Sequence, residues 1–362
     1  MTKFYVRAAI KYNEVITMRI ALVGFGGVGK AFLRLLADKR EELLKEGLDI
    51  QVNYVINSIG GVYQPKGISI DDFYRFLETE KDLTKYPHGG SKEISFKKVI
   101  ENMDVDMVVE MTPTNKVTGE PGLTHIRKSL ENGIHVVTAN KGPILLKHKE
   151  LNELAVQNKV QLGVGCTTGG ALPSVNGGLL DMAGTNVYSI EGILNGTTNF
   201  ILKEMEEKEI SYQQALQHAQ EMGIAETNPA MDVEGWDTAI KLLILTNVLM
   251  KEEKTLEDIS VDGISHLTIE DIRKAKKDGK RYKLIGRSLK KEGQLEITVQ
   301  CELVSQDHML YGISGENKAV RYCSDTLGDL TLSGGASGLI PTAASLLRDI
   351  VNIHRGVKFS RM

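Results

Sequence analysis

The chain has 362 residues, of which 41% are hydrophobic and 25% charged, and its formal net charge is −3. This composition excludes a disordered or fibrous protein, while the length predicts two or three domains rather than one core. The sequence has neither the clustered basic surplus that indicates nucleic-acid binding nor an apolar run of the roughly 18–20 residues that cross a bilayer.

The cysteines and the N-terminal segment indicate the cellular compartment. Cys166, Cys301 and Cys323 are far apart and form no paired motif, which favours a reducing cytoplasm and predicts no zinc site. Residues 1–17 lack the continuous apolar core of a signal peptide. Because Met18 directly precedes the first predicted strand, we expect residues 1–17 to be an extension, or the product of a start codon placed too early.

Strands and helices are predicted to alternate through the first 150 residues. The apolar run from Arg19 to Gly24 predicts a buried parallel strand, and the spacing of apolar residues from Val28 to Lys45 predicts a helix after it. Further elements are predicted as strands at 50–56, 106–110 and 134–138 and a helix near 123–132. This alternation is typical of a doubly wound, Rossmann-like α/β domain, and the stretch 60–97 is left unassigned.

Beyond about residue 150 the pattern changes to that of a second domain of the α+β class. Helices are predicted at 151–158, 197–208, 212–222, 233–250 and 341–353, and strands at 160–164, 281–287 and 294–304. Ser211 is a good N-cap for the helix that follows it. Pro341 suits the first turn of the last helix.

A glycine turn joins the first predicted strand to the first predicted helix. Its residues are Gly24, Phe25, Gly26, Gly27, Val28 and Gly29. In this context the first glycine permits a tight turn, the second lets the backbone approach a pyrophosphate, and the third allows close packing of helix on strand. We therefore predict a dinucleotide site, the alternative being a turn needed only for packing.

The choice between the two nicotinamide cofactors depends on the end of the second strand. NAD sites usually carry an Asp or Glu there that binds the ribose 2′-hydroxyl. Here the strand ends in Ile56-Asn57-Ser58, without a carboxylate, which removes the main repulsion against a 2′-phosphate. We predict NADP, with NAD as the alternative, and Lys66 is the only nearby cation in the sequence.

Acidic residues and a lysine lie close together around residue 235. Asp237 and Lys241 are one helical turn apart and share a face, and Glu226 precedes the helix in a loop. Such a pair is often no more than a solvated ion pair on a helix surface. The helix continues as the apolar run Leu242 to Leu245, however, so it should be buried, and a buried charged pair favours a functional site.

Four segments of the chain resemble homoserine dehydrogenases. They are residues 138–143, 191–199, 219–241 and 334–344, and with the glycine turn they extend over nearly the whole chain from Met18. The resemblance implies NAD(P)-dependent interconversion of L-homoserine and L-aspartate 4-semialdehyde, in the biosynthesis of threonine, methionine and isoleucine. Two alternatives remain open: another dehydrogenase of a small amino acid or semialdehyde, and a non-catalytic dinucleotide sensor on the same fold.

The resemblance also implies roles for individual residues. The catalytic residues would be Lys241, Asp237 and Lys141. The substrate ligands would be Glu226, Asn195, Gly196 and Thr197. The cofactor ligands would be the glycine turn, Thr112, Lys141 and Gly338. A lysine already charged at pH 7 suits the proton donor that reduction of a carbonyl requires.

At one position the sequence departs from the family. Members often bind a sodium ion through main-chain carbonyls and a glutamate, and the matching position here is Gly165. Backbone oxygens of Thr168 and Gly170 would remain as ligands, but the anionic anchor is missing. We therefore predict no metal site, with a sodium ion bound by backbone oxygens as the alternative.

The resemblance further implies the domain plan and the assembly. The dinucleotide-binding domain would comprise 18–150 together with 312–362, and the substrate-binding and dimerisation domain 151–311. A homodimer is expected to form through the sheet of the second domain. The chain corresponds to the short, monofunctional form of the family, for which we expect no C-terminal regulatory domain.

Overall fold

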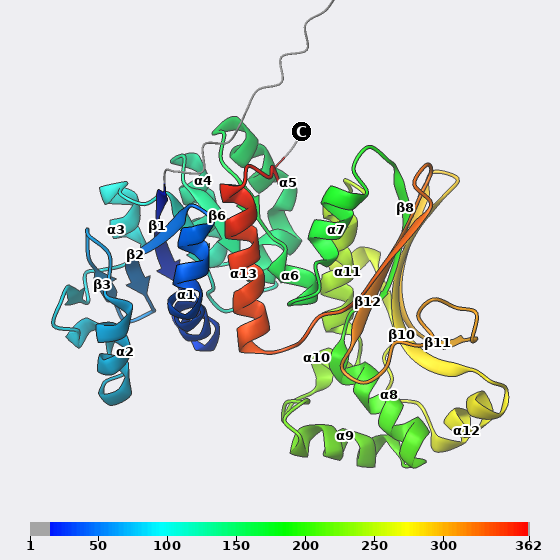
Figure 1. Cartoon of the computed structure of the whole chain (residues 1–362). Coiled ribbons are helices and arrows are strands. Elements are labelled where there is room, and N and C mark those ends of the chain that lie inside the picture. Colours follow the sequence, from blue (N-terminus) through cyan, green and yellow to red (C-terminus); the bar gives the residue numbers. More distant parts are fainter. Residues whose placement is uncertain (1–14, 361–362) are drawn as a thin grey trace, which may run out of the picture.

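The computed structural model describes residues 15–360, which form two sheets with helices packed around them (Figure 1). The first sheet has seven strands in the order β4-β3-β2-β1-β5-β6-β7. They are β1 (Ile16–Val23), β2 (Leu48–Ile56), β3 (Gly61–Tyr63), β4 (Gly90–Ser91), β5 (Met107–Glu110), β6 (His135–Thr138) and β7 (Leu162–Gly163). The predicted strands of this domain are confirmed.

Helices flank this sheet and include the last helix of the chain. They are α1 (Gly27–Lys45), α2 (Ile70–Thr79), α3 (Phe96–Asn102), α4 (Gly122–Glu131), α5 (Lys141–Gln157) and α13 (Leu339–His354), with the short 3₁₀ helix η1 (Leu83–Lys85). In Figure 1, α13 stands beside α1 although nearly three hundred residues separate them, and the two helices are in contact.

The N-terminal boundary differs slightly from the prediction. β1 begins at Ile16, which pairs in parallel register with Leu48, and Thr17 pairs with Asp49. These two residues therefore belong to the first sheet and not to an extension. Residues 1–14 of the expected extension lie outside the described residues.

The strand order contains a point at which its direction reverses. β1 pairs in parallel with β2 on one side and with β5 on the other. The connection after β1 leads to β2 on one side, whereas the connection after β5 leads to β6 on the other side, so the two diverge at the carboxyl ends of these strands. In doubly wound sheets this reversal opens the crevice in which a dinucleotide binds.

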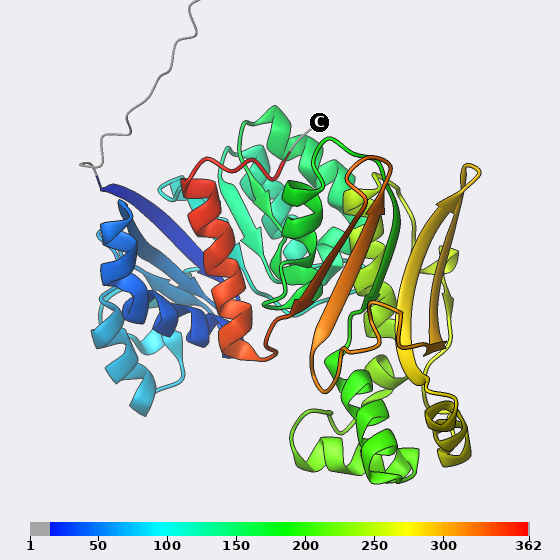
Figure 2. The ribbon, with the colours of Figure 1, turned by 45° about the vertical axis from the view of Figure 1, so that its right-hand side comes forward.

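The second sheet has six strands in the order β13-β12-β8-β10-β11-β9. They are β8 (Val187–Ile193), β9 (Ser260–Val261), β10 (Arg281–Lys291), β11 (Gln294–Val304), β12 (Lys318–Ser324) and β13 (Asp329–Gly334). The predicted hairpin is β10–β11, which pairs antiparallel along its whole length. Figure 2 shows helices on one face of this sheet and mainly loops on the other.

The helices of this second part lie between the two sheets or at the lower end of the molecule in Figure 1. They are α6 (Cys166–Gly169), α7 (Ser174–Asp181), α8 (Gly196–Lys208), α9 (Tyr212–Glu221), α10 (Ala230–Val233), α11 (Trp236–Leu249) and α12 (Ile269–Lys277), with the 3₁₀ helix η2 (Leu256–Asp258). Within residues 15–360 no helix is both long and apolar enough to traverse a bilayer.

The domain boundaries differ from those expected. α5 is kinked at Lys147, where φ is −143°, and its second half runs past residue 150 to Gln157. β7 follows it and pairs with β6, so residues up to 163 still belong to the first sheet. β12 pairs with β8, and β13 with β12, so residues 318–334 belong to the second sheet. The chain therefore returns to the first part at α13 and not at residue 312. β10 pairs with one edge of β8, and β12 pairs with the other edge. This pairing satisfies backbone groups of β8 that would otherwise lack hydrogen-bond partners.

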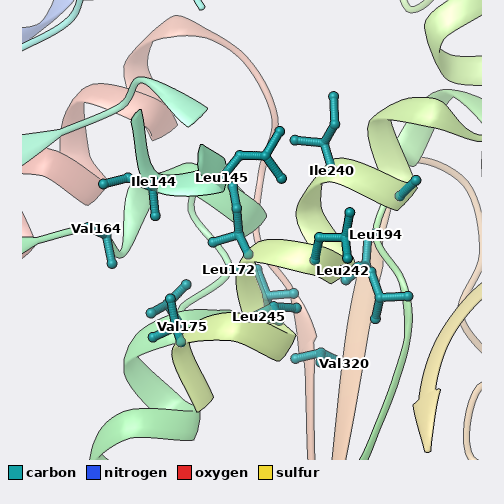
Figure 3. Close-up of a cluster of buried hydrophobic side chains, with 14 of the residues drawn as sticks. Ile144, Leu145, Val164, Leu172, Val175, Leu194, Ile240, Leu242, Leu245 and Val320 are labelled. Carbon is teal, nitrogen blue, oxygen red and sulfur yellow. The ribbon is translucent and has the colours of Figure 1, made fainter. Parts of the chain in front are cut away.

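A continuous apolar cluster joins the two parts (Figure 3). Leu145 from α5, Val175 from α7, Leu242 from α11 and Val320 from β12 all belong to it. α11 is apolar on every side, as its central run of leucines and isoleucine predicts, and the side chains from Leu242 to Leu245 are fully buried. Each such side chain contributes about 1.5–3 kcal/mol by leaving water, so α11 is held firmly.

The predicted helix 233–250 is in fact two helices. Gly235 adopts φ +84° between α10 and α11, a conformation that ends one helix and starts the next in a new direction. Its backbone is left-handed, which glycine adopts without strain. As a result, Asp237 and Lys241 lie in the first turns of α11.

Candidate active site

The glycine turn lies at the crevice between β1 and β5. Gly24 has φ +95°, and a Cβ atom on it would lie 2.5 Å from the carbonyl carbon of Met111 and 2.6 Å from the amide nitrogen of Thr112. A Cβ atom on Gly26 would meet nothing within 4 Å, so this backbone faces open space. A Cβ atom on Gly29 would lie 2.8 Å from the Gly24 carbonyl oxygen. The close contacts at Gly24 and Gly29 agree with a tight turn and with close packing of helix on strand.

The first turn of α1 presents free amide groups beside that open space. Its N-cap is Gly26, and no side chain caps the helix. Phe25 is buried and packs against Phe73 with ring centroids 5.8 Å apart. Unsatisfied N–H groups and the positive end of the helix dipole favour a bound phosphate.

A cleft of about 1280 Å³ runs along the carboxyl ends of these strands. Its walls come from the glycine turn, the ends of β2 and β5, the start of α3 and the start of α4. The residues that matter below are Asn57, Ser58, Lys97, Thr112, Thr114 and Lys116. A cleft with apolar and polar lining at the switch point of such a sheet is typical of a cofactor site. Lys66, which the sequence offered as the nearby cation, lines a different hollow, beside Arg40 and Gln51.

Thr112 is held at the base of the cleft by a buried carboxylate. The fully buried Glu110 accepts hydrogen bonds from the amide of Thr112 at 3.0 Å and from its hydroxyl. Thr138 donates a further hydrogen bond to the same carboxylate at 3.1 Å. The position of Thr112 in the cleft therefore agrees with its expected place near the cofactor.

The second focus of the site is Asp237 between two lysines. Its carboxylate lies 2.8 Å from the Nζ of Lys141 and 2.5 Å from the Nζ of Lys241. Only 13% of the Asp237 side chain and 15% of the Lys241 side chain are exposed. Lys241 also donates a hydrogen bond to the carbonyl oxygen of Leu194 at 2.9 Å. The predicted set of Lys141, Asp237 and Lys241 is thus brought together from α5 and α11.

The charge cluster adjoins the dinucleotide cleft. Lys141 is the first residue of α5, and its amide donates to the hydroxyl of Thr114, a cleft residue, at 3.3 Å. On the same rim, Lys116 lies 3.4 Å from the sulfur of Met231 in α10. The cleft and the cluster therefore lie next to each other.

The charges in this cluster shift one another's proton affinities. Although burial opposes the shift, Lys241 and Lys141 hold the pKa of Asp237 far below its ordinary range. Burial alone would lower the pKa of Lys141, but the Asp237 carboxylate raises it above its ordinary value. The cluster at neutral pH is therefore a carboxylate that neutralises neighbouring ammonium groups.

Asn195 links this cluster to the start of α8. Its Nδ2 donates to Asp232 at 2.6 Å and to Asp237 at 2.9 Å, while its Oδ1 accepts from the amide of Thr198 at 2.9 Å. Burial raises the pKa of Asp232. One amide side chain thus caps a helix and orients two carboxylates, and its position agrees with the expected role near substrate.

The remaining expected substrate residues lie around the same helix terminus. Gly196 begins α8, and the Thr197 hydroxyl donates to the carbonyl oxygen of Ile224 at 3.1 Å. Glu226 is exposed on the loop after α9, and its backbone oxygen accepts from Gln220 at 3.1 Å. Glu226 is therefore not in contact with the charge cluster, because the loop that carries it lies open.

Gly338 forms the N-cap of α13, where φ is +109° and a Cβ atom would meet nothing within 4 Å. The next residue, Leu339, packs over the glycine turn, since a Cβ atom on Gly27 would lie 3.0 Å from it. Val28 is half-buried in α1. The structure thus brings Gly338 next to the expected dinucleotide site.

The space in front of Gly165 is filled by another side chain. A Cβ atom on Gly165 would lie 2.6 Å from the Asn176 side-chain oxygen. The fully buried Asp349 accepts hydrogen bonds from the Gly165 amide at 2.8 Å and from Asn176 at 2.7 Å. A glutamate side chain would not fit here. Within residues 15–360, no group of three or more His, Cys, Asp or Glu residues has the spacing to hold a metal ion.

Three residues of the site were missed by the sequence reasoning. Asp232 was visible in the segment 219–241 but was given no role. Lys97 lines the cleft from α3, in the stretch left unassigned. Lys318 begins β12 and is buried close to the charge cluster; its sequence surroundings carry no signal, since contact across strands is not visible in a local pattern.

Comparison with known proteins agrees with this geometry. Residues 24–164 match the family model "Homoserine dehydrogenase, NAD binding domain", and residues 173–351 match "Homoserine dehydrogenase". A homoserine dehydrogenase of Methanocaldococcus jannaschii is 39% identical over 94% of this chain and 100% of its own length. The chain belongs to the homoserine dehydrogenase family. It is accordingly an NAD(P)-dependent oxidoreductase, and the predicted family and fold class are confirmed.

Other relatives extend the comparison. The NAD(+)-dependent homoserine dehydrogenase of Pseudomonas canavaninivorans is 37% identical over 93% of this chain and 96% of its own length. The crystal structure of a homoserine dehydrogenase from Thiobacillus denitrificans has a TM-score of 0.79 and 28% identity, covering 94% of this chain and 74% of the other. A hyperthermophilic archaeal homoserine dehydrogenase mutant in complex with NADPH has a TM-score of 0.80 at 23% identity, covering 96% and 100%; it shows the shared fold alone.

Proposed function

We propose that the chain reduces L-aspartate 4-semialdehyde to L-homoserine and prefers NADPH to NADH as hydride donor. The observation that carries the direction is the buried Asp237 carboxylate between Lys141 and Lys241. A carboxylate in this position stabilises neighbouring ammonium groups. An ammonium is the form that donates a proton, as reduction of an aldehyde requires.

The residues of the cluster divide the chemistry among them. When bound, the nicotinamide cofactor supplies the hydride that reduces the aldehyde carbon. Lys241, fixed by Asp237 and by the carbonyl oxygen of Leu194, donates the proton to the carbonyl oxygen as its negative charge grows. Lys141 adds a second positive charge that stabilises this oxygen. Asp237 orients both lysines.

Substrate recognition falls to the elements around the cluster. Asn195, Gly196 and Thr197 stand at the start of α8, next to Asp237. Glu226 would bind the substrate's amino group, which requires the exposed loop after α9 to fold towards the cleft. Gly223, with φ +70° and open space around it, gives this loop a hinge.

The preference for NADPH rests on the end of β2. Asn57 and Ser58 line the cleft where a carboxylate would repel a 2′-phosphate, and Lys97 lines it from α3. The Lys97 side chain is 84% exposed, and its ammonium lies 3.4 Å from the Glu101 carboxylate. Because this ion pair is exposed and long, the ammonium can move to bind a phosphate. Because the similar Pseudomonas enzyme is named as NAD(+)-dependent, the rates of this protein with NADPH and with NADH must be compared directly.

Steady-state assays with aspartate 4-semialdehyde and either NADPH or NADH test the proposal. We expect kcat/KM to be at least about tenfold higher with NADPH, the ratio that about 1.4 kcal/mol of binding energy produces. Lys241→Ala should lower kcat with NADPH by about 100-fold or more. Equal rates with NADH would overturn the cofactor preference, and full turnover of Lys241→Ala would overturn the mechanism.

One substitution separates cofactor recognition from folding. Asn57 accepts hydrogen bonds from the amides of Ile59 at 2.9 Å and Gly60 at 3.2 Å through its side-chain oxygen. Asn57→Asp keeps these acceptors and adds a negative charge, so KM for NADPH should rise about tenfold while that for NADH stays level or falls. Lys66→Ala, outside the cleft, is the matched control.

We further propose that the chain forms a homodimer through the second sheet. The face of this sheet away from α11 carries an ion-pair network in which Glu191 accepts from Arg287 at 3.2 Å and from Arg321 at 2.9 Å. Figure 2 shows no helix over this face. An open six-stranded sheet with satisfied charges on its face suits the stacking of an identical sheet about a two-fold axis.

A further inference from the structure

Lys318 is a buried lysine that the mechanism above does not use. It is 5% exposed, and no carboxylate of residues 15–360 forms an ion pair with it within 4.0 Å. The hydrogen bond found for its ammonium is to the Ser337 hydroxyl at 3.0 Å. An ammonium has three N–H donors, and a buried charge without a partner is costly. Lys318 therefore retains capacity for an anion.

The fold directs Lys318 towards the charge cluster. Val320, two residues along β12, lies in the apolar cluster that also contains Leu242 of α11 (Figure 3). Because side chains alternate along a strand, Lys318 faces the same side as Val320. Its Nζ lies 3.6 Å from the position of a Cβ atom on Gly170.

The segment that carries Lys318 packs on the first turn of α8. A Cβ atom on Gly196 would lie 2.8 Å from the Glu316 carbonyl oxygen. Asn199 Nδ2 donates to the Asn317 carbonyl oxygen at 3.1 Å. These contacts place the start of β12, which carries Lys318, beside the first turn of α8, and both the ammonium and the positive end of that helix attract negative charge.

We propose that Lys318 is a specificity-determining residue whose ammonium, with the first turn of α8, binds the α-carboxylate of the substrate. This rests on the proposed function, because the substrate assigned there carries one carboxylate and the cluster of Asp237, Lys141 and Lys241 is occupied with its aldehyde. The Ser337 hydroxyl holds the ammonium in place and ties it to the loop before α13.

The charge of Lys318 depends on pH in the working range. Burial, with help from the charge of Lys241, lowers the pKa of Lys318 to about 8, while Asp237 and Glu316 oppose the shift. A lysine with a lowered pKa loses its charge as the pH rises through that value. Recognition of the carboxylate should therefore weaken above about pH 8.

The test compares Lys318→Met with Lys283→Met. Lys283 is a matched control: it is 3% exposed, burial lowers its pKa to about 8, and it donates to Asn199 at 3.0 Å and to the carbonyl oxygen of Ile313. We expect Lys318→Met to raise KM for aspartate 4-semialdehyde about 10–100-fold, the loss typical of one charge-assisted hydrogen bond. The value of kcat should change less than about threefold, and Lys283→Met should leave KM unchanged.

A second substrate identifies what Lys318 binds. 3-Aminopropanal keeps the aldehyde and the amino group but lacks the carboxylate, so wild type and Lys318→Met should reduce it with equal kcat/KM. An equal loss of kcat/KM with both substrates would overturn the proposal. A change confined to KM for NADPH would also overturn it, because Lys318 would then act on cofactor binding. Failure of the wild type to reduce aspartate 4-semialdehyde would instead contradict the proposed function.

Two further measurements distinguish binding of the carboxylate by Lys318 from a purely structural role of this residue. Lys318→Arg keeps the charge and should recover most of the lost KM, whereas a merely structural lysine would gain nothing from the guanidinium. The ratio of kcat/KM between wild type and Lys318→Met should fall as the pH rises through about 8. A ratio that stays constant from pH 7 to pH 9 would contradict a charge-dependent role.

Discussion

Asp237 shows how one side chain serves both stability and chemistry. It satisfies Lys141, Lys241 and Asn195 at once, at 2.8, 2.5 and 2.9 Å. Lys141 is the first residue of α5, and Asn195 is the N-cap of α8. The carboxylate therefore joins both parts of the chain at the point where we propose that the aldehyde binds.

Asp237→Asn should reduce kcat by about 100–1000-fold with a smaller change in KM, because the two lysines lose the group that orients them. It should also destabilise the protein by about 3 kcal/mol, since two neighbouring buried ammonium groups would face each other. Steady-state kinetics and thermal unfolding measure the two effects. Glu257→Gln, an exposed carboxylate in η2, should change neither.

The same cluster predicts a pH dependence of stability. The lowered pKa of Asp237 means that its contribution is present above the ordinary value of 3.8 and is lost as the pH falls through the folded value. The raised pKa of Lys141 means that its contribution is present below 10.5 and is lost as the pH rises through the folded value. The difference in melting temperature between wild type and Asp237→Asn should be level from about pH 5 to 9. A steady slope across that window would contradict this assignment.

For individual residues, the sequence predicts contacts between residues that are close in sequence and misses contacts between residues that are far apart in sequence. The pairing of Asp237 with Lys241 follows from helical spacing. Lys141 lies 96 residues before Asp237, and Asn195 lies 42 before it. Their roles came from resemblance to a family, because nothing in local spacing relates residues on different elements.

At the scale of elements, the start of α8 combines a cap with a site. Asn195→Ala removes the cap, which should cost about 1 kcal/mol, and also frees Asp232 and Asp237, so kcat/KM should fall at least about tenfold. Ser211→Ala removes the capping box of α9 at a similar cost in stability, with no change in kcat/KM. Equal activity of the two variants would show that Asn195 is a cap only.

The glycine turn gives a second prediction about an element. Gly24→Ala should weaken NADPH binding more than tenfold and destabilise the protein, because its Cβ atom would overlap the Met111 and Thr112 backbone. Gly133→Ala is the control: φ is +71° but the space around it is open, so only about 1 kcal/mol of backbone strain is expected. Titration with NADPH followed by fluorescence measures the change in cofactor binding in the two variants, and thermal unfolding measures the change in their stability.

Several elements were not predicted, and they include α2, a helix of ten residues, as well as short strands. The stretch 60–97 contains β3 and β4, with three and two residues, too short for an alternating pattern to emerge. The break at Gly235 was missed because the apolar spacing continues across it, and only the φ of +84° separates α10 from α11.

At the scale of the whole molecule, the assignment of β12 and β13 was the largest difference. The resemblance to the family placed residues 312–362, and with them both strands, in the dinucleotide-binding domain. Their partners are β8 and each other, and partner choice depends on which sheet edge is available. Such long-range pairing is not encoded in any single window of the sequence.

The proposed dimer can be tested on this second sheet. Light scattering should give about twice 39.9 kDa for the wild type. Thr298 and Gln300 lie on the face of β11 that Glu302 shares with Arg287. Changing both to arginine should produce a monomer, since a two-fold interface brings each substitution to the same opposing surface. Lys274→Glu on α12, away from this face, should remain dimeric.

The contact of α13 with α1, β6 and β7 has a consequence for biosynthesis. During translation the cofactor-binding sheet is complete long before α13 leaves the ribosome, yet the helix that covers it is among the last segments made. At about 5–20 residues per second, the apolar surface of α1 would stay uncovered for many seconds. A fragment ending near residue 170 should accordingly bind a hydrophobic dye, and a synthetic peptide of residues 336–360 should displace it.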